Sequence, residues 1–86
     1  MIMMKTPLAI DVQPQLNYML LVTFDNDEKR LFDCKPYLEF KGFEELRSIP
    51  LFNTVKVAGL SVEWPRGQDI CPDDLYDNSR PINFGN

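Results

Sequence analysis

The fold of this chain is decided by one stretch of fifteen residues, Val62–Tyr76, whose sequence is VEWPRGQDICPDDLY. Val62 and Trp64 flank a charged residue, an alternation that is typical of a strand with one buried face. Pro65 ends that strand because proline has no N–H to donate to a sheet, and Gly67 favours an unusual turn geometry. A second proline then predicts a helix start. A strand end, a turn and a helix start therefore follow one another.

A short helix is expected to begin at Cys71-Pro72 and to reach about residue 78. Pro72 suits the first helical position, where no backbone N–H is needed, and the two aspartates that follow it suit the positive end of the helix dipole. Leu75 and Tyr76 are adjacent, so we expect one of them to face the core and the other to face solvent.

Five segments, including the one that Pro65 ends, have the alternation or branched residues of strands: 7–12, 18–24, 28–33, 54–58 and 61–64. Residues 18–24 are apolar on both faces, which predicts a central strand covered at least partly on both sides. In the first strand we expect Leu8, Ile10 and Val12 on one face. Asp25–Asp27 tolerate left-handed backbone geometry and predict a hairpin turn.

Brief helical elements are expected between the hairpins. Pro36 begins one turn, residues 43–47 form a short helix, and Ser48 caps another turn. Together these elements predict one α+β domain, a small antiparallel β-meander of about five strands with short helices inserted and a short C-terminal helix. We expect its core to cover about residues 7–78, with 79–86 as a tail. The pattern leaves the strand order open.

Composition limits the class of protein. A chain of 86 residues is too short for two independently packed cores. Its net charge is −4 and its basic residues are not clustered, so we expect no direct nucleic-acid binding. No apolar run approaches the roughly 20 residues that span a bilayer. The first five residues are too short for a signal peptide, so we expect a cytoplasmic protein that does not bind a membrane.

The residue types also limit the chemistry. The chain has no histidine, which excludes Ser-His-Asp and Cys-His catalysis and removes the commonest zinc ligand. Cys34 and Cys71 are too few and too far apart in sequence for a cysteine-rich metal site, and we expect both to be reduced. The glycines stand alone, so no phosphate-binding loop is present. We expect no catalytic residue, no metal and no cofactor, and hence no enzyme.

Two features of the sequence leave a metal site or a reactive thiol as alternatives. Asp69, Asp73 and Asp74 are a concentrated set of oxygen ligands for Mg²⁺ or Ca²⁺. Their spacing is not that of an EF-hand, so we favour roles in the turn and the helix start. Cys71 at a helix start could be an activated thiol, but carboxylates surround it and no base is at hand, so we favour a partly buried structural cysteine. The alternative function is a small enzyme or sensor using Cys71 or the acidic site.

The same stretch contains candidates for binding another protein. Trp64 beside Arg66 could form a binding hot spot, although the alternation favours inward packing of the indole ring. An exposed Tyr76 would be a contact residue. The candidate interaction or turn motif therefore consists of Trp64, Arg66, Asp69, Cys71, Asp73 and Tyr76.

Several motifs of the chain resemble those of a known family. They are YMLLVTFDN at residues 18–26, Phe32-Asp33, Leu51-Phe52-Asn53 and the stretch 62–76, and they resemble the bacterial domain of unknown function 2442 family. The resemblance covers about residues 7–76, although Asp27-Glu28 stands where the family usually has Gly-Glu. It implies a small α+β domain without an assigned activity or catalytic residue. Relatives often occur beside another small protein, as in toxin–antitoxin pairs.

We therefore expect a non-enzymatic module that interacts with another protein. In the antitoxin-like form of this function, the module is the partner of another small bacterial protein. A further alternative is a homo-oligomeric structural protein in which an exposed hairpin edge pairs between copies.

Overall fold

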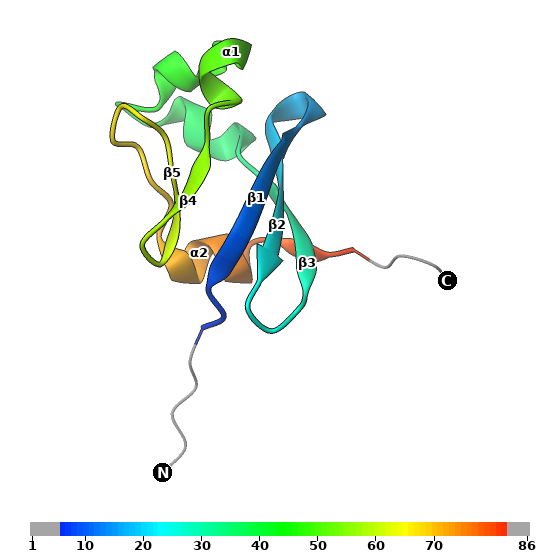
Figure 1. The fold of residues 1–86 in the computed structure, drawn as a ribbon. Helices are drawn as coiled ribbons and strands as arrows, with labels where there is room; N and C mark the ends of the chain where they lie inside the picture. Colours follow the sequence, from blue (N-terminus) through cyan, green and yellow to red (C-terminus); the bar gives the residue numbers. More distant parts are fainter. Residues whose placement is uncertain (1–5, 83–86) are drawn as a thin grey trace.

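The computed structural model describes residues 6–82, which form two antiparallel sheets and several short helices (Figure 1). The larger sheet has the order β1 (Ala9–Gln15), β2 (Met19–Phe24), β3 (Lys29–Asp33), β6 (Arg80–Pro81). The smaller sheet pairs β4 (Lys56–Ala58) with β5 (Ser61–Glu63). The predicted α+β fold class is confirmed, with the strands divided between two sheets.

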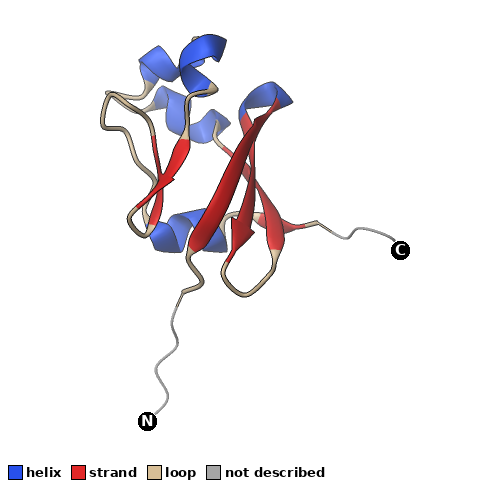
Figure 2. Cartoon of the chain, viewed as in Figure 1, coloured by secondary structure: helices blue, strands red, loops and turns tan. Residues whose placement is uncertain are grey.

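Helical turns gather at the two ends of the molecule, with the strands between them (Figure 2). At one end are the 3₁₀ turns η1 (Leu16–Tyr18), η2 (Lys35–Glu39) and η3 (Glu44–Arg47) and the helix α1 (Ile49–Phe52); at the other is α2 (Pro72–Asp77). The proline-led turn and the short helix are confirmed. Ser48 precedes α1, but its side chain makes no capping hydrogen bond. No helix within residues 6–82 is long and apolar enough to cross a membrane.

Strand β2 supplies the centre of the core. Leu20, Val22 and Phe24 are all fully buried, because alternate residues of a strand share one face. On the other face, Met19 and Leu21 are half-buried. β2 lies between β1 and β3, so the prediction of a central strand is confirmed.

Strand β1 does not have the predicted buried face. Ala9 is buried, whereas Ile10 is 58% exposed. The pairing of β1 with β2 shifts register between Ala9 and Asp11, and such an irregularity moves the following side chains to the other face. Val12 consequently packs against the core while Ile10 does not. The strand also continues through Pro14, which an edge strand tolerates.

A buried tryptophan connects the smaller sheet to the rest of the molecule. Trp64 is 1% exposed, and its Nε1–H donates a hydrogen bond of 2.8 Å to the carbonyl of Phe52. The centroids of these two rings lie 5.8 Å apart, and Tyr18 packs edge-on against Phe52 at 5.3 Å. The predicted inward packing of Trp64 is confirmed. Gly67 has a φ of +100°, the left-handed geometry expected for the turn that follows.

The C-terminal segment adds a strand that the sequence does not predict. Arg80 and Pro81 of β6 pair with Leu31 and Arg30 of β3, within the segment expected to be a tail. The amide of Ile82 then donates to the carbonyl of Lys29 at 2.9 Å. A strand of two residues has no alternation to detect, because its pairing depends on where α2 delivers the chain. Residues 83–86 of the expected tail lie outside the described residues.

We expect Trp64→Phe to lower the free energy of unfolding by about 1–3 kcal/mol, because the Phe52 carbonyl loses its buried donor. Urea denaturation followed by circular dichroism measures this. Leu60→Ala is the matched control: Leu60 is 60% exposed, and its loss should stay within about 0.5 kcal/mol. A Trp64→Phe effect as small as that of the control would contradict the importance of the hydrogen bond.

Candidate functional site

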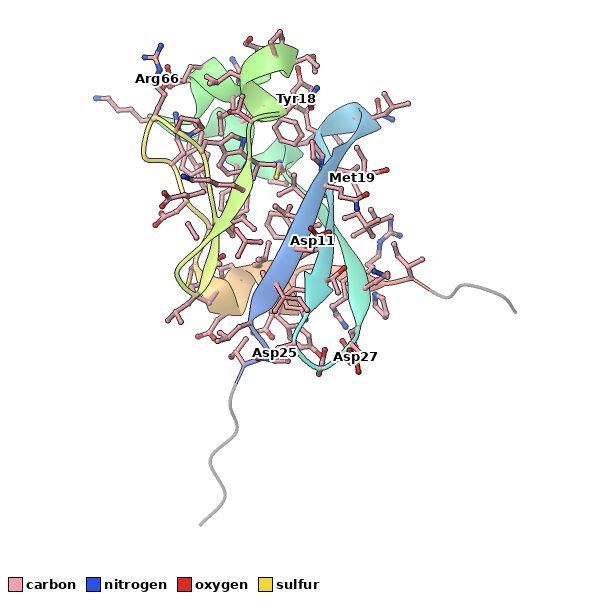
Figure 3. All side chains as sticks on the ribbon, viewed as in Figure 1. Asp11, Tyr18, Met19, Asp25, Asp27 and Arg66 are labelled. Atoms are coloured by element: carbon pink, nitrogen blue, oxygen red, sulfur yellow. The ribbon has the colours of Figure 1, made fainter. Side chains whose placement is uncertain are left out.

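Exposed aspartates gather around α2. Figure 3 shows Asp25 and Asp27, in the turn between β2 and β3, at the same end of the molecule as α2. The hydroxyl of Thr6 donates to Asp73 at 2.6 Å, and the amide of Leu8 donates to Asp25 at 3.1 Å. The segment 6–8 therefore contacts both α2 and the turn between β2 and β3. We call this surface the acidic end and define it by five exposed residues: Asp25, Asp27, Asp73, Asp74 and Asp77.

Among residues 6–82, the carboxylates of the acidic end form no ion pairs. Four ion pairs join residues within 6–82, and none of them includes a residue of the acidic end. The four pairs are Arg30–Glu28, Lys35–Asp33, Arg47–Glu39 and Arg66–Glu45. The acidic end is therefore a cluster of exposed carboxylates without an ion pair among residues 6–82.

Among residues 6–82, the side chain of Asp74 has one hydrogen-bond partner. The hydroxyl of Tyr37 donates to it at 3.3 Å. Burial, and then the negative charge of Asp74, raises the pKa of Tyr37 to about 12. Tyr37 therefore stays protonated at neutral pH and acts as a hydrogen-bond donor. A carboxylate has about four lone-pair sites, so Asp74 retains capacity for further donors.

The structure does not bring Asp69, Asp73 and Asp74 together as a metal site. Within residues 6–82, no group of three His, Cys, Asp or Glu side chains is placed to hold a metal ion. Asp73 and Asp74 occupy the first turn of α2, as predicted. Asp69 instead forms an isolated antiparallel bridge with Glu63 of β5. The turn before it is held by backbone bonds, such as that from the amide of Trp64 to the carbonyl of Gln68.

The two cysteines have opposite environments. Cys71 precedes α2 and is exposed, so the prediction that it is partly buried is wrong. The reason is that α2 turns Leu75, not the cysteine before its first turn, toward the core. Cys34 is the buried thiol, at 2% exposure. Burial, and next the negative charge of Asp33, raises the pKa of the Cys34 thiol to about 12.

Tyr76 is anchored within the fold. Leu75 is fully buried and Tyr76 is half-buried, which confirms that one of the pair faces the core. The Tyr76 hydroxyl donates to Glu28 at 2.8 Å, and the guanidinium of Arg30 lies 4.3 Å from the centroid of its ring. The hydrogen bond from Tyr76 is the main cause of the lowered pKa of Glu28. These contacts join α2 to β3, so Tyr76 has a structural role.

Trp64 and Arg66 do not form an exposed pair. Trp64 is buried, whereas Arg66 is exposed and its guanidinium lies 3.4 Å from a carboxylate oxygen of Glu45. Arg66 lies at the end of the molecule opposite the acidic end (Figure 3). The two residues therefore do not make one hot spot.

Two cavities complete the candidate sites. The first, of about 340 Å³, lies beside β5 and is lined by Ser61, Glu63, Asp69 and Cys71 among others. Sequence reasoning missed Ser61 and Glu63, although their alternation with Val62 would have placed them together on the other face of β5.

The second cavity, of about 360 Å³, we call the notch. It is lined by Pro14, Gln15, Leu16, Asn17, Ile49 and Asn53. Leu16, at 87% exposure, and Ile49, at 48%, make it apolar.

A family model described as "Protein of unknown function (DUF2442)" matches residues 9–81. No curated protein and no solved structure matches the chain.

We expect one thiol of the native protein to react with a disulfide reagent at pH 8 and two to react after unfolding in urea. The exposed thiol of Cys71 reacts, whereas burial protects Cys34 and keeps it protonated. The absorbance of the thiolate that the reagent releases gives the number of protein thiols that have reacted. Cys71→Ser is the control and should leave no reactive thiol in the native state. Two rapidly reacting thiols in the native wild-type chain would contradict the burial of Cys34.

Proposed function

We propose that this chain, which belongs to the DUF2442 family of proteins of unknown function, is a non-enzymatic module that binds a small basic protein through its acidic end. The observation that supports this most is the group of exposed aspartates on and beside α2 that take part in no ion pair among the described residues.

Electrostatics explains why such a surface favours a basic partner. Carboxylates close together repel one another, and a partner surface with lysine and arginine side chains relieves that repulsion. Complementary charge speeds association and discriminates against other acidic proteins, and salt weakens it. The net charge of −4 acts in the same direction at longer range.

The form of this function that we propose is antitoxin-like. The support for it is the family resemblance alone, since relatives occur beside another small protein. In that role the module would bind its partner stoichiometrically and cover a basic surface of it.

We expect affinity purification of the tagged chain from its native cells to yield one small basic protein in stoichiometric amount. Asp73→Asn/Asp74→Asn/Asp77→Asn should weaken binding at least about tenfold, since three charges of about 0.5 kcal/mol each correspond to that factor. Isothermal titration calorimetry with the purified partner measures it.

Asp11→Asn/Glu39→Gln/Glu44→Gln is the matched control for this experiment. It changes the net charge equally but leaves the acidic end intact, and it should change the affinity by less than about threefold. Equal weakening by both triple variants would show that net charge alone matters and would contradict a binding surface at α2.

A second candidate function, a homo-oligomeric structural protein, is favoured by the notch. None of its six lining residues is charged, so two acidic copies could approach there without direct repulsion. Asn17 and Tyr18 both have φ near +60°, and the Tyr18 hydroxyl donates to the carbonyl of Arg47 at 2.6 Å. This anchored turn projects Leu16 into solvent beside Ile49.

If the chain forms such a dimer, light scattering will give twice the monomer mass of 10.0 kDa at high protein concentration. Leu16→Asp should then restore the monomer, because each copy would bury a charge in the interface. Gln13→Asp, on an exposed position of β1, is the control for the added charge. A monomer mass for the wild-type chain at every concentration would reject this candidate.

A further inference from the structure

The cavity beside β5 presents two carboxylates on one surface. The bridge between Glu63 and Asp69 is antiparallel, and residues directly opposite one another in such a pair point to the same face. Ser61 lies two residues from Glu63 on β5, so the two share a face. Cys71 follows Asp69 by two residues. All four residues line the cavity, together with the buried residues Val62 and Ile70.

Within the described part of the chain, neither of these two carboxylates forms an ion pair. Like charges directly opposite one another in a sheet are destabilising. Lys56 is the opposite neighbour of Glu63 on β4, but it neither lines the cavity nor forms any of the four ion pairs among residues 6–82. Glu63 and Asp69 also take part in none of those pairs. The unfavourable pair is therefore left for a cation from outside the chain.

Ser61 is an independent indication that the cavity takes a ligand. It is 6% exposed, and its hydroxyl has no hydrogen-bond partner among residues 6–82. A buried hydroxyl without a partner costs about 1–3 kcal/mol, so such groups are rarely left unpaired. A ligand that donates hydrogen bonds would supply the missing partner at the same place as the two carboxylates.

We propose that this cavity binds the ammonium group of a lysine side chain from the basic partner, an inference that rests on the proposed function. Glu63 and Asp69 supply the negative charge, and the Ser61 hydroxyl accepts one of the three hydrogen bonds that an ammonium group donates. The volume of about 340 Å³ leaves room for the aliphatic part of the side chain beside Leu60 and Pro72, which also line the cavity. The acidic end steers the partner, and this cavity receives one of its cations.

Cys71 at the edge of the cavity allows a test that needs no partner. The native chain is equilibrated with equal amounts of cystamine and 2-hydroxyethyl disulfide. The Cys71 thiolate attacks either disulfide, forms a mixed disulfide and releases the other half as a thiol. One adduct ends in an ammonium group and the other in a hydroxyl group of similar length. Mass spectrometry gives the ratio of the two adducts, relative to the same chain unfolded in urea.

We expect the ratio of ammonium adduct to hydroxyl adduct to be at least about fivefold higher in the native chain than in the unfolded chain. Glu63→Gln/Asp69→Asn should reduce this preference to less than about twofold without loss of stability, since it removes a like-charge pair. Lys56→Gln should increase it, because a competing cation is lost. Asp11→Asn/Glu44→Gln changes the net charge equally, lies outside the cavity lining and should leave the preference unchanged.

Capture of the partner from native cells decides where the ammonium group comes from. Reduced capture by Glu63→Gln/Asp69→Asn, together with loss of the adduct preference, supports the proposal. Equal adduct ratios in the native and unfolded chain overturn it, even if the wild-type chain captures a basic protein and the proposed function stands. An adduct preference with undiminished capture overturns the assignment to the partner and indicates a free small amine. Absence of any captured partner rejects the proposed function.

Discussion

The structure depends on the buried hydrogen bond from the Trp64 indole to the Phe52 carbonyl. α1 has four residues and β5 has three, and elements this short are not stable without tertiary packing. The rings of Tyr18, Phe52 and Trp64 pack in series and join η1, α1 and the residue that follows β5. Because β5 is fixed in this way, the turn at Gly67 directs the chain back along β5 toward α2. The position of the acidic residues thus follows from the packing of the core.

The parts of the fold that could be predicted are those in which side-chain spacing alone decides burial. Leu20, Val22 and Phe24 alternate in a regular strand, and hydropathy therefore gives their burial directly. Ile10 follows the same hydropathy pattern but lies at a register shift between β1 and β2. That shift depends on backbone pairing, so the order of apolar and polar residues does not predict it. β6 depends on the placement of α2 beside β3, a tertiary relation that a two-residue strand cannot encode.

The candidate site likewise contains residues whose placement could be predicted from the sequence and residues whose placement depends on tertiary structure. Local rules for helix starts placed Asp73 and Asp74 correctly, because the helix dipole acts within one turn. The exposure of Cys71 depends on which segments cover the start of α2, and it could not be obtained from the thiol and its neighbours in sequence. The pairing of Glu63 with Asp69 joins β5 to the segment after the Gly67 turn, so it required the path of that turn. The stretch that decides the fold therefore also brings the two carboxylates together.

In the function proposed above, the stretch 62–76 both completes the core and forms the surface that a basic partner contacts. Amide hydrogen exchange of the native chain, measured with and without the captured partner, shows whether both roles fall on these residues. We expect slower exchange on binding in residues 60–63 and 69–77, around the cavity and α2. Slower exchange confined to residues 14–17 and 49–53, around the notch at the opposite end, would contradict it.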